Sequence, residues 1–115
     1  MRAIVCGGRD FDNEALLNET LSGMGIAHII EGGASGADTL AWRWARHNLG
    51  KGSEHISQFK ARWDEHGRAA GPIRNQQMLD QGKPDIVIAF AGGRGTADMV
   101  RRANRAGVRV LEVKA

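Results

Sequence analysis

The chain has 115 residues, of which 42% are hydrophobic and 25% charged, and a formal net charge of +3. Such values are typical of one globular domain with one core, so we expect residues 1–115 to form a single domain. No apolar run is long enough to span a bilayer and no signal peptide is visible, which predicts a cytoplasmic protein. The single cysteine, Cys6, excludes an internal disulfide and is expected to be a buried thiol.

The first quarter of the chain predicts a strand followed by a helix. Residues 3–6 are apolar and end at Gly7 and Gly8. Asp12 is the expected N-cap of a helix whose apolar residues recur at helical spacing until Gly23.

A second strand–helix unit follows, and then a weaker strand. Residues 27–31 form the expected strand, Ser35 the expected cap of the next helix, and Asp38 its capping-box partner. The segment 55–59 is short and half polar, which favours a strand at the edge of the sheet.

The second half begins with a segment without periodicity, residues 60–71, which we interpret as a long functional loop. Pro72 suits the start of a helix that reaches about Gln81. A central strand, a helix and a closing strand are expected at residues 85–90, 96–106 and 108–113.

This alternation predicts an α/β fold, a Rossmann-like doubly wound sheet of five parallel strands with helices on both faces. The first and fourth strands are short and almost wholly apolar, so they should be central, which gives the order 3-2-1-4-5. A ligand would then bind beyond the carboxyl ends of the strands, where the strand order reverses.

Three glycine-rich turns, the first at residues 7–10, the second at 32–36 and the third at 92–96, follow apolar strands and should meet at this edge of the sheet. Glycine lets backbone approach a ligand closely, and a helix N-terminus favours an anion, so the turns predict a phosphate site. A tight turn without a ligand remains the alternative for each. The predicted binding residues in the turns are Gly7, Gly8, Arg9, Asp10, Gly32, Gly33, Ser35, Gly36, Gly92, Gly93, Arg94, Gly95 and Thr96.

Two further binding residues are predicted outside these turns. Arg74 in the first turn of a helix opposes the helix dipole and invites a compensating anion, and Asn75 follows it. Asp10 would accept from a ribose hydroxyl or hold Arg9 in place. Trp63 is interpreted as a core or interface side chain, with nucleobase stacking as the alternative.

The sequence indicates neither a metal site nor a cofactor. Its four histidines and one cysteine do not have the spacings of metal ligands. A Walker sequence is absent, and the dinucleotide pattern G-x-G-x-x-G does not follow the first strand.

The motifs at residues 7–11, 31–38, 63–75 and 92–96 resemble the SLOG superfamily, and most closely its YspA-type branch. The resemblance covers essentially the whole chain. It implies a Rossmann-like domain that binds nucleotides or derivatives such as those of ADP-ribose, often as a sensor in conflicts between bacteria and phages.

Two related branches supply alternatives. Lonely-guy phosphoribohydrolases cleave nucleoside monophosphates and carry Pro-Gly-Gly-x-Gly-Thr followed by paired glutamates. Here Ala91 replaces the proline, and Asp98 and Met99 occupy the acidic positions, so Asp98 is the one catalytic candidate. The DNA-processing protein DprA has a turn similar to residues 32–38, which suggests single-stranded DNA. The shortage of aromatic residues makes nucleic acid an unfavoured partner, and an edge strand with Trp42 leaves a homodimer open.

Overall fold

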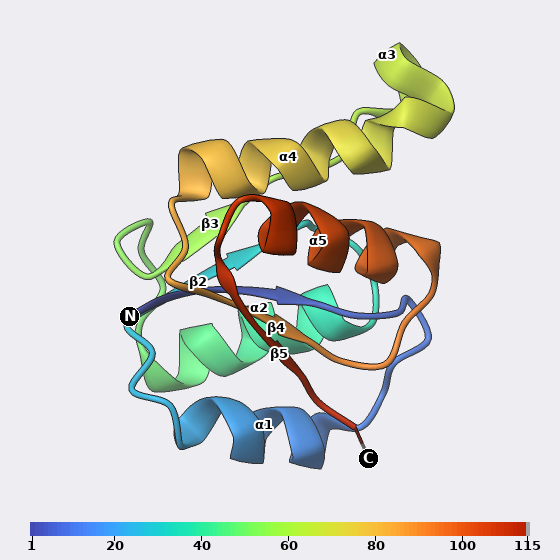
Figure 1. Ribbon diagram of the computed structural model, residues 1–115. Coiled ribbons are helices and arrows are strands. Elements are labelled where there is room, and N and C mark those ends of the chain that lie inside the picture. Colours follow the sequence, from blue (N-terminus) through green and yellow to red (C-terminus); the bar gives the residue numbers. More distant parts are fainter. Residues whose placement is uncertain (115) are drawn as a thin grey trace.

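The computed structural model describes residues 1–114 and contains a parallel sheet between two layers of helices (Figure 1). The strands are β1 (Arg2–Cys6), β2 (His28–Glu31), β3 (Ile56–Gln58), β4 (Ile86–Ala89) and β5 (Arg109–Glu112). The helices are α1 (Glu14–Ser22), α2 (Ala37–Asn48), α3 (Trp63–His66), the 3-10 turn η1 (Gly67–Ala69), α4 (Ala70–Gly82) and α5 (Arg94–Arg105).

The strand order is β3-β2-β1-β4-β5 with every pair parallel, which confirms the predicted Rossmann-like fold. The central strands β2 and β4 are buried along their whole length, whereas most of the edge strand β5 is exposed. The expectation of an edge position for the segment around residue 56 is also confirmed.

Alternation along the strands divides the core into two clusters, one on each face of the sheet. Ala3 and Val5 pack on the side of α1 and α2, while Ile4 between them joins the cluster with Met78 and Met99 of α4 and α5. Figure 1 shows α1 and α2 together on one face and α4 and α5 on the other. Both faces of the sheet are therefore covered, as the apolar central strands require.

Two helix caps differ from the sequence expectations. The cap of α1 is Asn13, whose side chain accepts from the N–H of Leu16 at 3.1 Å, and not Asp12. Ser35 does not cap α2, because the N-cap is Gly36 and the Ser35 hydroxyl donates to the carbonyl of Arg9 at 3.3 Å. Ser35 precedes the N-cap by one residue, and its hydroxyl does not accept from an N–H group in the first turn of α2.

The segment expected as a loop, residues 60–71, contains α3 and η1, and α4 begins at Ala70 rather than at Pro72. The helix α3 has only four residues, too few for a hydrophobic periodicity to be visible in the sequence. It projects beyond the start of α4 (Figure 1). Among residues 1–114, no helix combines the length and the apolar character that a membrane crossing demands.

Candidate functional site

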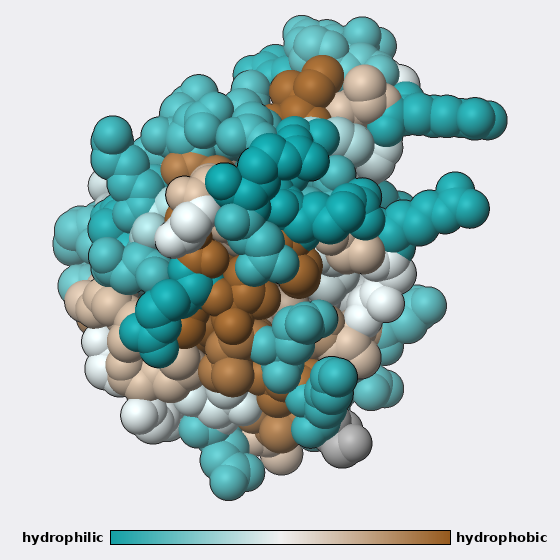
Figure 2. Space-filling model, in the orientation of Figure 1, coloured by the Kyte–Doolittle hydropathy of each residue, from teal (hydrophilic) through white to brown (hydrophobic). Residues whose placement is uncertain are grey.

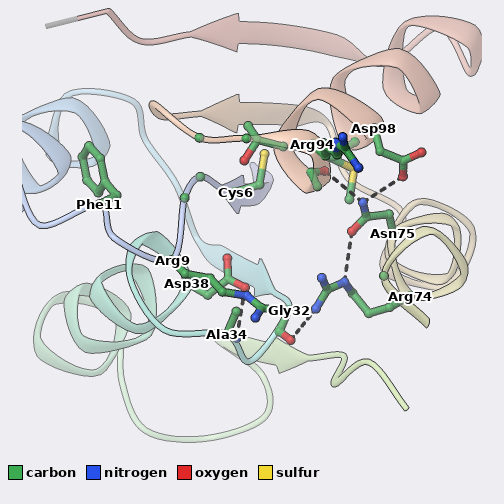
Figure 3. A pocket seen from close by; sticks show the side chains of 18 of the residues that line it. Cys6, Arg9, Phe11, Gly32, Ala34, Asp38, Arg74, Asn75, Arg94 and Asp98 are labelled. Carbon is green, nitrogen blue, oxygen red and sulfur yellow. Dashed lines mark hydrogen bonds between the residues drawn. The ribbon is translucent and has the colours of Figure 1, made fainter. Parts of the chain in front are cut away.

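A cavity of about 1000 Å³ opens at the carboxyl end of the sheet, where the strand order reverses between β1 and β4. Figure 3 shows it from close by, and Figure 2 shows the hydrophilic side chains that surround the apolar band on one face of the molecule. Its lining includes most of the predicted binding residues, namely Gly7, Gly8, Arg9, Asp10, Gly32, Arg74, Asn75, Gly92, Gly93, Arg94, Gly95 and Thr96. The fold thus brings distant segments to one surface, as expected for an open α/β sheet.

Gly8 joins the first turn to both neighbouring turns through its backbone. Its N–H donates to Ala91 at 2.8 Å, and its carbonyl accepts from the N–H of Ala37 at 3.3 Å. A Cβ on Gly8 would lie 3.1 Å from the Ala91 carbonyl, and one on Gly7 would lie 2.7 Å from the Cβ of Ala37. These two glycines are therefore required by the packing of the turns against each other, whatever they bind.

The N-terminus of α5 is open toward the cavity. Gly93 is its N-cap, no side chain caps it, and its first turn carries no acidic residue. The N–H groups of Arg94, Gly95 and Thr96 precede the first intrahelical donor, Ala97, which bonds to the Gly93 carbonyl at 3.0 Å. A Cβ on Gly93 or Gly95 would meet nothing within 4 Å. This end of α5 has both the donors and the space that an anion needs.

The N-terminus of α2 differs, because protein groups already accept from its first N–H and from the turn before it. The Ala34 N–H donates to Asp38 at 3.2 Å, and the Ala37 N–H donates to Gly8. Gly33 and Gly36 do not line the large cavity, and Ser35 lines only a smaller one of about 230 Å³ beside it. The N-terminus of α2 is therefore less available to an anion than that of α5, although the two turns have similar sequences.

A chain of hydrogen bonds crosses the floor of the cavity and joins the second turn to α5 (Figure 3). Arg74 Nη1 donates to the carbonyl of Gly32 at 2.6 Å, and its Nε donates to Asn75 Oδ1 at 3.0 Å. Asn75 Nδ2 donates to the carbonyl of Gly95 at 3.2 Å and to Asp98 Oδ2 at 3.0 Å. Because these bonds occupy the buried Asn75 amide, its direct contribution is to position the first turns of α5.

Asp98 lines the same cavity as an ionised carboxylate. Burial opposes its ionisation, but hydrogen bonds from Asn75 and Arg102 hold its pKa below the ordinary value. Arg102 Nε lies 2.9 Å and Arg101 Nη2 lies 3.6 Å from the carboxylate oxygens. A carboxylate in this state is a poor proton donor, and two arginines balance its charge.

Sequence reasoning missed Glu31, a buried carboxyl beneath the second turn. Its oxygens accept from the Gly33 N–H at 2.6 Å and from Gln58 Nε2 at 2.8 Å. Burial raises the pKa of Glu31 to about 7, and burial likewise raises the pKa of Asp38 to about 6. The only signal in the sequence was an acidic residue at the end of an apolar strand.

Cys6 and Trp63 also line the cavity, with different surroundings. Cys6 ends β1, and burial raises the pKa of its thiol to about 12, so the neutral form predominates. Trp63 is 49% exposed, which contradicts the interpretation of a core side chain. The guanidinium carbon of Arg9 lies 5.5 Å from the centroid of its ring.

No three His, Cys, Asp or Glu side chains within residues 1–114 are grouped so that they could hold a metal ion. The cavity presents backbone N–H groups, arginines and an ionised aspartate. These groups suit recognition of an oxyanion.

Comparison with known proteins identifies the family. Residues 1–66 match the model of the YspA, cpYpsA-related SLOG family. The chain is also 38% identical over 86 residues to the Gene 61 protein of Mycobacterium phage D29, in an alignment that covers 72% of this chain and 68% of that protein. The matched residues include the first two glycine turns, Arg9 and Trp63. The protein described here therefore belongs to the YspA, cpYpsA-related SLOG family.

Proposed function

We propose that this protein binds a nucleotide or a nucleotide-derived ligand, such as a nucleoside phosphate or an ADP-ribose derivative, in the large cavity. The observation that carries the proposal is the open N-terminus of α5, whose free N–H groups face a cavity lined by arginines. Membership of the SLOG family supports a ligand of this class.

The phosphate is assigned to the N–H groups of Arg94, Gly95 and Thr96. Arg9 and Arg94 are exposed and line the cavity, so their guanidinium groups can turn toward an anion. Arg74 is held by Gly32 and Asn75, and it contributes positive charge from a fixed position. Asp10 lies at the same rim and is assigned to a ribose hydroxyl.

Such a protein would act as a sensor or as a sequestering protein in the cytoplasm, where nucleotides are abundant. The similarity to a phage protein agrees with a role in conflicts between bacteria and phages. Under this proposal the cavity needs to bind and release its ligand, and no reaction is required.

Calorimetric titration with AMP and with ADP-ribose tests the proposal in wild type, Gly93→Val and Arg9→Ala. A valine at residue 93 meets no protein atom within 4 Å of its Cβ, so it should fill the anion position, leave the fold intact and abolish binding. Arg9→Ala should weaken binding by roughly 1.5–3 kcal/mol, because it removes a charged hydrogen bond.

Arg46→Ala is the matched control, because Arg46 also lies over an exposed indole, that of Trp42 at 4.7 Å, on a different helix. Its affinity should equal that of wild type. Unchanged affinity in both Gly93→Val and Arg9→Ala would show that the ligand does not use this cavity.

A further inference from the structure

Trp63 presents a large apolar ring to solvent at the rim of the cavity. Its exposed fraction of 49% is the largest among the exposed large hydrophobic residues described, and it belongs to neither apolar cluster of the core. The four-residue helix that carries it packs mainly on η1 and on the start of α4. Core packing therefore does not explain this side chain.

The position of Trp63 relates it to both cavities. It lines the large cavity and also the smaller one, whose other lining residues are Arg9, Ala34, Ser35 and Arg74. One edge of the indole lies beside Gly71 of α4, since a Cβ on Gly71 would lie 3.4 Å from Trp63 Cη2. Half of the side chain remains exposed at the rim of the cavity, beside the proposed ligand.

A charged side chain lies over this ring. The guanidinium carbon of Arg9 lies 5.5 Å from the ring centroid, and Arg9 is itself exposed. Cation–π contacts at exposed sites are weak, whereas stacking of a nucleobase on an aromatic ring contributes substantially to binding. A planar base can therefore displace the guanidinium from the indole.

We propose that the indole of Trp63 is the stacking platform for the base of the nucleotide, and that Arg9 exchanges the indole for the phosphate when the ligand binds. This inference rests on the function proposed above and assigns the second half of the ligand. Phosphate binding draws Arg9 away from the ring, and the base takes its place. The two events therefore reinforce each other.

The proposal also defines the class of ligand. Every base has a π face, so a stacking platform tolerates different bases but rejects a ligand without one. The cavity should accordingly prefer nucleotides over sugar phosphates that carry the same phosphate and ribose. Specificity among bases would have to come from other contacts.

Calorimetry with AMP and with ribose 5-phosphate tests this assignment in wild type, Trp63→Ala and Trp63→Phe. Trp63→Ala should weaken AMP binding by roughly 5- to 150-fold, the range of one stacked base. The affinity for ribose 5-phosphate should not fall, because Arg9 then has no indole to leave, and Trp63→Phe should retain most of the AMP affinity. Trp42→Ala is the matched control, because it removes the other exposed Trp–Arg pair, outside the cavity, and should leave both affinities unchanged.

The intrinsic fluorescence supplies a second readout. AMP should quench the indole emission of wild type and of Trp42→Phe, and the quench should be absent in Trp63→Phe, which still binds. If Trp63→Ala weakens AMP and ribose 5-phosphate equally, or weakens neither, the stacking assignment is wrong while the anion site stands. If wild type binds neither of these probes nor ADP-ribose, the assignment and the proposed function are both wrong.

Discussion

At the scale of single residues, two buried carboxyls make the stability of the protein depend on pH. Glu31 is 1% and Asp38 7% exposed, and burial raises both pKa values, to about 7 and about 6. A raised pKa in the folded state means that the folded chain binds more protons than the unfolded chain. The free energy of unfolding therefore falls as the pH rises from the unfolded pKa to the folded one.

For Glu31 this window extends from about pH 4.5 to about pH 7. We expect urea denaturation between these values to show decreasing stability with increasing pH. Glu31→Gln should flatten the profile, because the new side-chain carbonyl still accepts from the Gly33 N–H, and the Gln58 amide can rotate so that its oxygen accepts from the new NH2 group. Glu54→Gln, at a side chain that is 73% exposed, should leave the profile unchanged. An identical slope in Glu31→Gln and wild type would exclude this origin of the pH dependence.

At the scale of elements, the turns that form the cavity are held together by backbone contacts. Gly36 has φ of 76°, and a Cβ there would lie against the carbonyls of Gly8 and Arg9, the latter at 2.6 Å. Gly8 in turn bonds to Ala91. The turn before α2 is therefore a support for the first turn, and its glycine serves packing.

Gly36→Ala should destabilise the fold by more than Gly107→Ala does. Both residues have φ of 76°, but a Cβ on Gly107 meets nothing within 4 Å, so Gly107→Ala measures backbone strain alone, of roughly 1–3 kcal/mol. The excess in Gly36→Ala reports the clash between the turns. Chemical denaturation measures both variants, and equal losses of stability would mean that the turns do not constrain each other.

At the scale of the whole molecule, the cavity exists only in the folded chain, because its walls come from residues as distant as Cys6 and Arg101. A ligand that binds only the folded state stabilises it in proportion to the logarithm of its concentration. Folding and binding are therefore linked, and ligand binding can be followed through thermal stability.

We expect AMP or ADP-ribose at about 100 times its dissociation constant to add roughly 2.7 kcal/mol, which corresponds to an increase in Tm of roughly 10 °C. Thermal denaturation followed by circular dichroism measures this shift. Gly93→Val should unfold at its own Tm whether or not ligand is present. An equal increase in wild type and in Gly93→Val would indicate binding elsewhere.

Much of the fold follows from patterns along the chain. The alternation of short apolar runs with helical periodicities predicts the parallel sheet, and the wholly apolar strands at Ala3–Cys6 and Ile86–Phe90 predict its centre. The glycine turns are also visible in the sequence, so the edge at which they meet follows from the topology. These features depend on local periods and on burial, which a sequence records directly.

The tertiary structure alone decided which turn is open and which side chains are free. The turns at Gly36 and Gly93 look alike in sequence. At the first, the Ala37 N–H donates to Gly8 and the Ala34 N–H donates to Asp38, whereas the second lines the cavity with no side-chain cap. The exposure of Trp63 likewise depends on the position of α3, which projects beyond the start of α4. Hydrogen-bond partners distant in the chain leave no periodic trace in it, so only the folded structure reveals them.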